Sequence, residues 1–423
     1  MATVFIIIYN ILLATVLIPA SIFILLFSGK YRKEIFYKIS ERFAKWDYTA
    51  KQNSKKTVWI HCSSLGEVRA VEPVLEQLKD GCNIILTVIT KTGRVYGEKI
   101  KTPDFVSLLP LDFYPLMNKA FKTVKPDILI LVETELWASM LYAAKKHNIK
   151  ILTVNGRMSA KSFKIYGSLK FFWKYFTDSI DLIMARSPED AERFAALSGR
   201  KENVFVSGNI KYDRDFNVKS LRSDFGLAQG DKVFTAGSIR ETEDEIVADA
   251  YLKINARGDG SRIYFFAAPR HLSKISSVKK TLAGKKIEYV LFSSLEAGKT
   301  PEKNFILVDV FGKLQSIYAI SDVCFVGGSI VNKGGQNPIE PAACGKPVLF
   351  GKNMDNFKTE SEILLKYGGG INVSGSDDIV FKTEEFFSDK DLMEKTGAKA
   401  LEAVNSQKGS VKITVNKIKE YFQ

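Results

Sequence analysis

Cysteine and histidine are both scarce in this chain of 423 residues. The four cysteines, Cys62, Cys82, Cys324 and Cys344, lie far apart and form no C-x-x-C pair. We therefore expect buried free thiols in a reducing compartment, and neither a disulfide framework nor a zinc site. With only three histidines, we do not expect a multi-histidine metal centre either. We find no internal repeat and no low-complexity tract.

Acidic residues are outnumbered, with 47 Asp and Glu against 61 Lys and Arg, so the net charge is +14. Such an excess suits acidic lipid surfaces, nucleic acid or phosphorylated small molecules. The aromatic residues do not form the basic-aromatic stripe of single-strand binders, so we expect no nucleic-acid partner. A hydrophobic content of 46% and a charged content of 26% are typical of a folded globular protein, and the length predicts more than one domain.

Charged side chains are missing altogether from the first 29 residues. Residues 4–27 are almost all apolar, and as a helix they would extend about 36 Å, enough to span a bilayer core of roughly 30 Å. Basic residues predominate over acidic ones between residues 30 and 56. By the positive-inside rule, this pattern predicts a single-pass membrane anchor, with the body on the cytoplasmic side. The basic segment also predicts contact with an anionic membrane surface. A cleaved signal peptide is the alternative, but there the basic residues would precede the apolar run.

From residue 57 onward, short apolar runs alternate with segments of helical length. Thirteen runs are expected to form strands: 58–60, 83–90, 105–110, 127–133, 150–155, 181–186, 203–208, 232–238, 263–269, 288–294, 304–309, 322–328 and 347–351. This alternation is typical of βαβ units whose parallel sheet is covered on both faces. It pauses over a polar stretch at 209–230, which indicates two doubly wound domains.

The predicted fold class is therefore α/β of the GT-B type, with two Rossmann-like domains facing a cleft and an N-terminal transmembrane helix. We expect an anchor at 1–29, a first Rossmann-like domain at 30–210, a second Rossmann-like domain at 211–400, and a C-terminal helix at 401–423 that packs back. Because fold does not determine function, the residues at the strand ends must indicate the chemistry.

The densest candidate site is the glycine-rich stretch at 326–351. Its glycines allow a ligand to approach the backbone closely. Asn337 is expected to cap a helix that has Pro338 in its first position. Such a helix N-terminus suits a phosphate, and Glu340 in the first turn could accept hydrogen bonds from ribose hydroxyls. An ordinary glycine-rich turn with a helix cap is the alternative.

Three further turns of the second domain also suit a phosphate. Gly237 and Ser238 precede one predicted helix, and Gly312 and Lys313 open another. Arg270 follows a buried strand, where a permanent cation suits a phosphate or carboxylate. Each turn alone could be ordinary loop chemistry, but together they indicate an anion site.

Carboxylates mark the strand ends of the first domain. Glu67 follows a short strand in "HCSSLGE", and Glu133 and Glu135 follow another in "LVETELW". Glu67 could be a helix-terminal carboxylate that interacts with the helix dipole. It could also be a catalytic base, because open α/β sheets bind ligands at this edge. Arg157 and Lys211 lie in neighbouring loops.

The ordered motifs "HCSSLGE", "ETELW", "GNIKYD", "APRH", "GGS" and "GGQNPIEP" resemble those of the 3-deoxy-D-manno-octulosonic acid (Kdo) transferases of lipopolysaccharide synthesis. The resemblance runs from about residue 4 to about residue 400. It implies an inverting glycosyltransferase of the bacterial inner membrane that moves Kdo from CMP-Kdo to a lipid A precursor (lipid IVA). The domain at 30–210 would bind the acceptor, and the domain at 211–400 would bind the nucleotide sugar. Glu67 would be the catalytic base, with Glu133 and Glu135 beside it. The CMP site would consist of Pro269, Arg270, Phe311, Gly312, Lys313, Asn337, Pro338, Ile339 and Glu340.

The chain departs from the family pattern at four positions. Gln336 and Arg240 stand where histidine is usual, Lys313 replaces an acid, and Ala138 replaces proline. The first three put individual side-chain contacts in doubt more than the reaction class. No metal or other cofactor is expected, because the D-x-D sequence Asp213 to Asp215 lies in the polar stretch between the domains.

Two alternatives remain open from the sequence. One is a nucleotide-sugar epimerase of the same fold, which would need neither an anchor nor a lipid acceptor. The other is a non-catalytic, membrane-anchored binding protein. The sequence gives no prediction for the oligomeric state, the number of Kdo units transferred or the acyl pattern of the acceptor.

Overall fold

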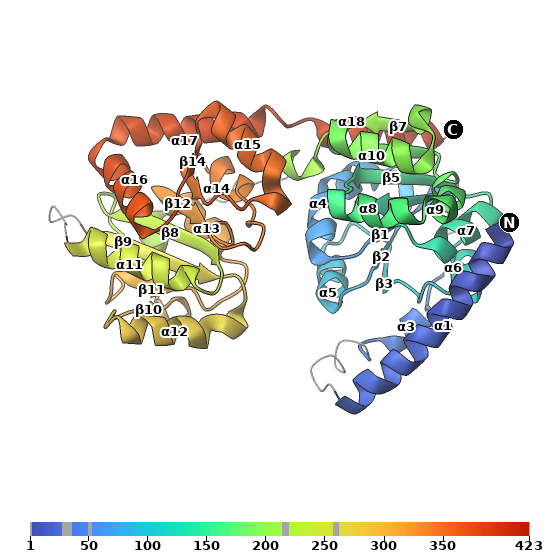
Figure 1. Ribbon diagram of the computed structural model, residues 1–423, viewed down its shortest axis with the longest axis horizontal. Coiled ribbons are helices and arrows are strands. Elements are labelled where there is room, and N and C mark those ends of the chain that lie inside the picture. Colours follow the sequence, from blue (N-terminus) through green and yellow to red (C-terminus); the bar gives the residue numbers. More distant parts are fainter. Residues whose placement is uncertain (1, 28–35, 50–52, 214–219, 257–261, 423) are drawn as a thin grey trace. The chain divides into compact units, whose positions relative to one another are not determined.

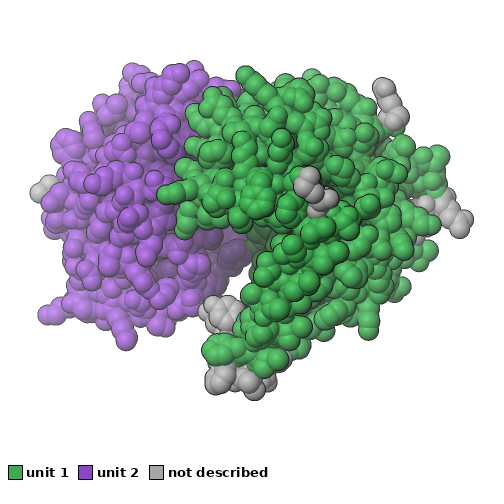
Figure 2. Space-filling model, turned by 45° about the vertical axis from the view of Figure 1, so that its right-hand side comes forward, with its two compact units in different colours: residues 1–214, 407–423 green, residues 215–406 purple. Residues whose placement is uncertain are grey.

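The computed structural model describes residues 2–27, 36–49, 53–213, 220–256 and 262–422. The chain divides into two compact units. Unit 1 contains residues 1–214 and 407–423, and unit 2 contains residues 215–406; Figure 2 shows them in green and purple. The units therefore divide within the polar stretch that interrupts the strand-helix alternation, and the end of the chain belongs to unit 1.

Unit 1 is built on a parallel sheet of seven strands (Figure 1), in the order β3-β2-β1-β4-β5-β6-β7. Its strands are β1 (Lys56–Cys62), β2 (Cys82–Val88), β3 (Phe105–Leu108), β4 (Ile128–Val132), β5 (Lys150–Gly156), β6 (Leu182–Ala185) and β7 (Val204–Val206). The central strands are buried along nearly their whole length, which explains why they appear as uninterrupted apolar runs in the sequence.

The helices of unit 1 connect these strands. They are α1 (Ala2–Phe27), α3 (Ile39–Arg42), α4 (Leu65–Leu78), α5 (Lys91–Lys99), α6 (Tyr114–Val124), α7 (Ala138–Lys146), α8 (Ala160–Ser168), α9 (Lys170–Thr177), α10 (Pro188–Ser198) and α18 (Ser410–Lys419). Helix α10 starts as its sequence predicts, because the Ser187 side chain accepts a hydrogen bond from Asp190 N and Pro188 follows it.

Unit 2 contains a second parallel sheet of seven strands, in the order β10-β11-β9-β8-β12-β13-β14. Its strands are β8 (Lys232–Ile239), β9 (Ile263–Pro269), β10 (Val290–Leu291), β11 (Phe305–Leu307), β12 (Val323–Val326), β13 (Val348–Phe350) and β14 (Gly370–Asn372). Its helices are α11 (Glu243–Ala256), α12 (Ile275–Gly284), α13 (Leu314–Ile320), α14 (Ile339–Ala343), α15 (Lys358–Tyr367), α16 (Ser376–Ser388) and α17 (Lys390–Asn405). The edge strand β14 was not expected from the sequence.

Both sheets reverse their strand order at one place. In unit 1 the order runs outward from β1 in one direction and from β4 in the other, and in unit 2 it reverses between β8 and β12. In doubly wound folds, the loops at the carboxyl ends of the two strands at such a switch point diverge and leave a crevice for a ligand. These two places position the candidate site residues.

Helix α1 is long and apolar enough to cross a membrane by length and composition. The stretch Thr3–Ile24 has a mean hydropathy of 2.3, and only 6% of its most apolar window is buried. One N-terminal apolar helix therefore fits membrane anchoring, as the sequence predicts. The cysteines are free, and Cys62, Cys82 and Cys324 are buried.

Candidate functional site

Glu67 lies in the first turn of α4, directly after β1. Ser63 N donates to its carboxylate at 2.6 Å, and Ser64 Oγ donates at 2.9 Å. The Ser63 hydroxyl donates as well. Ser64 is also the N-cap of α4, so this small-residue turn both starts the helix and binds the carboxylate. Glu67 is only 8% exposed.

The environment of Glu67 favours the protonated form. Burial raises the pKa of the Glu67 carboxyl, and the negative charge of Glu133 raises it further. Hydrogen bonds from Ser63 act in the opposite direction, because they stabilise the carboxylate, but the net pKa shift is upward. A carboxyl with a raised pKa is suited to accept a proton near neutral pH.

Glu133 follows β4, the neighbour of β1 at the switch point. Its φ is +65°, a left-handed conformation that is uncommon for a residue with a side chain and that often occurs at functional sites. Lys211 Nζ donates to Glu133 Oε1 at 2.7 Å. The structure therefore brings together two of the predicted site residues that lie 78 positions apart.

Glu135 is the third carboxylate at this edge. Trp137 Nε1 donates to Glu135 Oε2 at 2.6 Å, and His61 Nε2 lies 3.6 Å from that oxygen. Burial alone would raise the pKa of Glu135, but His61, Trp137 and Ser63 stabilise the carboxylate and lower that pKa overall. Glu135 and Glu67 are thus neighbours whose pKa values are shifted in opposite directions, as in sites that separate the roles of two carboxyls.

Thr134, between these two glutamates, ties the β4 loop to the next one. Its hydroxyl donates to the backbone oxygen of Arg157. The backbone of Arg157 therefore lies beside the loop that carries Glu133 and Glu135. The cluster of Glu67, Glu133 and Glu135 occupies the carboxyl ends of β1 and β4, where a doubly wound sheet binds its ligand.

Unit 2 has a corresponding structure at its own switch point. Glu243, at the start of α11, is fully buried, and its carboxylate accepts hydrogen bonds from three consecutive backbone N–H groups after β12. These are Gly328 N at 2.6 Å, Ser329 N at 3.0 Å and Ile330 N at 3.1 Å. Arg240 N donates to it at 2.9 Å. Glu243 thereby connects the loop after β8 to the glycine turn after β12.

The turn after β12 requires glycine at Gly327, because backbone atoms of the loop after β8 approach it closely. A Cβ atom on Gly327 would lie 2.5 Å from Ile239 Cα and 2.7 Å from Ser238 O. The two strand ends could not then pack as they do. Glycine is required at Gly237 for a different reason, since a Cβ there would lie 1.8 Å from the Tyr318 hydroxyl. Gly237 therefore makes room for a core tyrosine, and Ser238 beside it has a positive φ of 56°.

Arg270 follows β9, and its backbone N donates to Ile239 O at 3.0 Å. Burial lowers the pKa of the Arg270 guanidinium, and the positive charge of Arg240 lowers it further, while Glu340 opposes both. Two cations and one carboxylate are therefore close enough to interact electrostatically. Because like charges repel, this arrangement favours binding of an additional anion.

The turn around Asn337 differs from the prediction in one respect. Helix α14 begins at Ile339, so Pro338 precedes the helix instead of occupying its first position. Asn337 Oδ1 still accepts a hydrogen bond from Ile339 N at 3.1 Å, and its amide donates to Glu340 at 3.4 Å. Proline at this position cannot donate a hydrogen bond, so the Asn337 side chain satisfies the next backbone N–H in the chain.

The remaining predicted donor-site residues lie on two loops of unit 2. Pro269 is the last residue of β9. Phe311, which is 65% exposed, precedes Gly312 and Lys313 at the start of α13. Gly312 has a φ of +84° and open space where a side chain would be, so its turn is accessible to a ligand.

Three residues of these sites were not expected as site residues from the sequence. His61 lies inside β1 and resembles a strand residue in the sequence, although it interacts with Glu135. Glu243 is one of three acids in "EDE", and only its burial distinguishes it. Arg240, noted as a departure from the family pattern, has its guanidinium 3.0 Å from His271 Nε2.

Asp213, the first residue of the D-x-D sequence, has a structural role. Asp213 accepts a hydrogen bond from Gly409 N at 2.6 Å and another from Val411 N, at the start of α18. Asp215 lies outside the described residues. Among the residues that the structure describes, no group of three or more His, Cys, Asp or Glu side chains is arranged to hold a metal ion.

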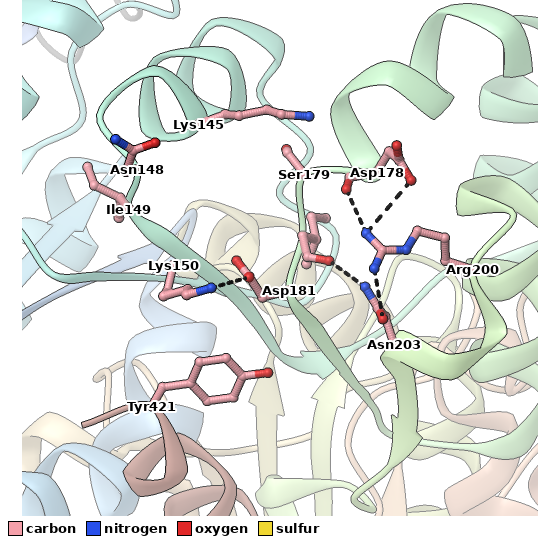
Figure 3. Close-up of a pocket in the computed structure, with 11 residues that line it drawn as sticks. Lys145, Asn148, Ile149, Lys150, Asp178, Ser179, Asp181, Arg200, Asn203 and Tyr421 are labelled. Atoms are coloured by element: carbon pink, nitrogen blue, oxygen red, sulfur yellow. Dashed lines mark hydrogen bonds and ion pairs between the residues drawn. The ribbon is translucent and has the colours of Figure 1, made fainter. Parts of the chain in front are cut away.

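A cavity of about 480 Å³ lies at the opposite, amino-terminal edge of the unit 1 sheet (Figure 3). Lys150, which begins β5, forms an ion pair of 3.0 Å with Asp181. Arg200 donates to the backbone oxygen of Asp178 at 3.0 Å and to Asn203 at 3.3 Å. Several of the polar groups that line the cavity thus pair with one another.

The family model and the similar proteins of known function indicate the same family. Residues 37–214 match the family model described as "3-Deoxy-D-manno-octulosonic-acid transferase (kdotransferase)". The chain is 30% identical to the 3-deoxy-D-manno-octulosonic acid transferase of Haemophilus influenzae over 94% of this chain and 93% of that protein. It is also 30% identical to the transferase of that name from Aquifex aeolicus, over 80% of this chain and 88% of that protein. A bifunctional glycosyltransferase/methyltransferase of Fusobacterium nucleatum is 33% identical, over 80% of this chain but only 54% of the relative's length.

Solved structures show the same fold at low sequence identity. The UDP-GlcNAc 2-epimerase of Neisseria meningitidis, bound to UDP-GlcNAc, aligns with a TM-score of 0.62 and 13% identity over 86% of this chain and all of that chain. HepE of Anabaena, in complex with UDP and glucose, aligns with a TM-score of 0.60 and 14% identity over 86% of this chain and 98% of that chain. The predicted α/β architecture of the GT-B type, with two parallel sheets, is confirmed.

We expect Glu243→Gln to loosen the glycine turn of unit 2. The amide of glutamine offers one acceptor oxygen where the carboxylate offers two, and hydrogen bonds to a charged group contribute about 1.5–3 kcal/mol each. Hydrogen exchange at Gly328, Ser329 and Ile330 should therefore accelerate. Glu245→Gln is the matched control, because Glu245 is exposed in the same helical turn. Unchanged exchange in Glu243→Gln would contradict the role of this carboxylate.

Proposed function

Since this chain belongs to the Kdo transferase family, we propose that it moves Kdo from CMP-Kdo to a lipid A precursor, lipid IVA, with inversion at the anomeric carbon. The observation that carries the proposal is the match to the Haemophilus influenzae transferase over nearly the full length of both chains. It is supported by a carboxyl with a raised pKa at the switch point of unit 1 and a cation pair at that of unit 2.

In this proposal Glu67 is the general base. A sugar hydroxyl becomes an effective nucleophile when a base removes its proton during the attack. Glu67 is buried and has a raised pKa, yet three donors from Ser63 and Ser64 hold its carboxylate in one orientation. The oxygen atoms are thus oriented before the substrate binds, and the acceptor hydroxyl would donate its proton to one of them.

Glu133 and Glu135 have supporting roles. Glu133 keeps the affinity of Glu67 for a proton high through its negative charge, and its own charge is balanced by Lys211. Glu135 remains ionised beside His61 and Trp137 and would accept hydrogen bonds from acceptor hydroxyls. Arg157 would contribute to the same loop cluster.

Unit 2 supplies the site for the leaving group. As the bond to Kdo breaks, negative charge develops on the phosphate of CMP, and fixed donors can stabilise it without a metal ion. Arg270 is the principal cation, and the backbone N–H groups around Gly312 add donors. Glu340 would accept hydrogen bonds from the ribose. Lys313, Phe311, Pro269, Asn337 and Pro338 shape the surrounding turns, and Gly237 and Ser238 close the β8 side.

Attachment to a membrane is supported by α1. We propose the cytoplasmic face of the bacterial inner membrane as the location, because the basic residues after the apolar run favour contact with its anionic cytoplasmic leaflet. A lipid acceptor would be available there. A nucleotide-sugar epimerase is the rival enzyme, and the likeness to the Neisseria meningitidis epimerase concerns the fold.

One assay separates these functions. Purified protein is incubated with CMP-Kdo, with and without lipid IVA, in buffer containing EDTA, and the CMP released and the mass of the lipid product are measured. We expect release of CMP that depends on lipid IVA, a product heavier by Kdo, and no effect of EDTA. Release without acceptor, or no product, would contradict the transferase proposal, and inhibition by EDTA would contradict the proposed independence of metal.

Arg270→Ala is expected to weaken CMP binding by roughly tenfold or more. The substitution removes a charged hydrogen-bond donor, and such bonds contribute about 1.5–3 kcal/mol. Isothermal titration calorimetry with CMP measures the effect, and Glu340→Ala tests the ribose contact in the same way. Arg262→Ala is a control, because Arg262 precedes β9 at the other end of that strand. Unchanged CMP affinity in both site variants would show that the donor site lies elsewhere.

Glu133→Gln should shift the acid limb of the kcat profile to lower pH. The rate requires ionised Glu67, so it falls as the pH falls through the pKa of Glu67. The negative charge of Glu133 raises that pKa, and its removal therefore lowers it. The measurement is kcat against pH at saturating CMP-Kdo and lipid IVA. An acid limb that stays in place or moves upward would contradict the electrostatic coupling of these carboxyls.

A further inference from the structure

Helix α1 makes specific polar contacts with the body of unit 1 near its N-terminus. Tyr9 Oη donates to Asp112 Oδ2 at 2.8 Å, and Asn10 Nδ2 donates to Ser139 Oγ at 3.1 Å. The backbone N of Tyr114 donates to Asn10 Oδ1 at 2.8 Å. These polar side chains of α1 therefore have partners on α7 and in the loop before α6.

Apolar packing reinforces this attachment. Ile6 is only 3% exposed and belongs to the core cluster of the sheet and helices of unit 1. The ring of Phe5 lies 5.9 Å from that of Phe171 and 5.9 Å from that of Phe172, both on α9. Figure 1 shows α1 beside α7, and α1 also contacts α9. The N-terminal part of α1 is thus packed as part of the folded unit.

Much of the remaining surface of α1 is apolar and exposed. Seven of its large side chains are between 54% and 64% exposed: Val4, Ile7, Ile11, Leu12, Val16, Ile18 and Phe23. A contiguous apolar surface of this kind is rare on a soluble monomer and marks contact with lipid or with another protein. Tyr9 and Asn10 thus have partners on the protein, while most of the large apolar side chains of α1 are exposed, which is the arrangement expected when the surrounding solvent is hydrocarbon.

The same surface continues onto α8 and α9. Ile165, Leu169 and Phe171 are 58%, 49% and 61% exposed, and Phe171 contacts Phe5 of α1. Four exposed lysines are interspersed with them: Lys161, Lys164, Lys170 and Lys174. Apolar side chains mixed with lysines are typical of a surface that binds at the headgroup level of an anionic bilayer.

We propose that α1, α8 and α9 form one bilayer-binding face, in which α1 lies in the membrane alongside the body of unit 1 and does not cross to the other side. The lysines of α8 and α9 bind anionic lipid headgroups. A crossing helix would carry its N-terminus to the face of the membrane away from the body. Tyr9 and Asn10 would then lose their partners inside hydrocarbon, where unpaired polar groups are costly. This inference does not depend on the transferase reaction.

Cross-linking in native membranes tests the position of α1. The full chain carries Phe5→Cys and Phe172→Cys, and a short bismaleimide should join the two in the membrane. Cys62, Cys82 and Cys324 are buried, and each single variant controls for reaction with the native thiols. Membrane-impermeant maleimide added outside spheroplasts should leave Phe5→Cys unlabelled. Labelling from outside without cross-linking would show that α1 crosses the membrane and would overturn the proposal.

A fluorescent probe tests α9 separately and does not require the double variant. Full-length Phe171→Cys labelled with an environment-sensitive dye is mixed with vesicles that contain lipid-attached quencher. We expect quenching that is stronger with phosphatidylglycerol than with phosphatidylcholine. Val206→Cys, an exposed position on β7, is the control and should not be quenched. A probe at residue 171 that remains in water on membrane-bound protein would overturn the proposal.

The lysines are tested by charge reversal. Lys161, Lys164 and Lys170 are changed together to Glu, and the control changes Lys79, Lys408 and Lys412, which are exposed on or beside α4 and α18. Each basic residue near an anionic surface contributes roughly fivefold in partitioning. The preference for phosphatidylglycerol over phosphatidylcholine vesicles should therefore fall by on the order of a hundredfold in the first variant only. Equal effects of the two triple variants would show that net charge alone is responsible and would contradict the lysine site.

Discussion

The constraint on which unit 1 depends is the placement of three carboxylates, Glu67, Glu133 and Glu135, at one edge of a buried sheet. Carboxylates removed from water repel one another and lose hydration, so the protein must supply donors to keep them. Ser63, Lys211 and Trp137 each donate to one of them. The hydrogen bonds and neighbouring charges differ between the carboxyls. As a result, the pKa of Glu67 is raised and the pKa of Glu135 is lowered.

Unit 2 has a complementary distribution of charge. The buried carboxylate of Glu243 accepts hydrogen bonds from the glycine turn and is therefore not available for chemistry. Arg240 and Arg270 at the neighbouring strand ends leave a local excess of positive charge. In the proposed function the first unit would supply a base and the second an anion site, the two functions that transfer from a phosphate-activated sugar requires. Both units have the same doubly wound topology, and it is the residues after the strands that differ.

The sequence predicted the sheet strands well where burial makes them continuous apolar runs, as in β1 and β4. It missed β14, because a three-residue strand that begins with glycine has no such signal. It identified the site loops, since they follow strands, but could not separate Glu243 from the acids beside it. The pairing of Glu133 with Lys211 and of Tyr9 with Asp112 joins positions 78 and 103 residues apart, and no local pattern encodes such contacts. The individual roles of the site residues stay predictions.

The measurement that tests the account most directly is the turnover of Glu67→Gln at saturating CMP-Kdo and lipid IVA, together with its affinity for CMP. Glutamine preserves the size of the side chain and cannot accept the proton. General-base catalysis contributes about 10²–10⁴-fold, so kcat should fall by that factor, while CMP affinity should stay the same because the proposed donor site lies in unit 2. If Glu67 only caps α4, the variant will lose about 1 kcal/mol of stability and keep nearly normal turnover, and that result would contradict the account.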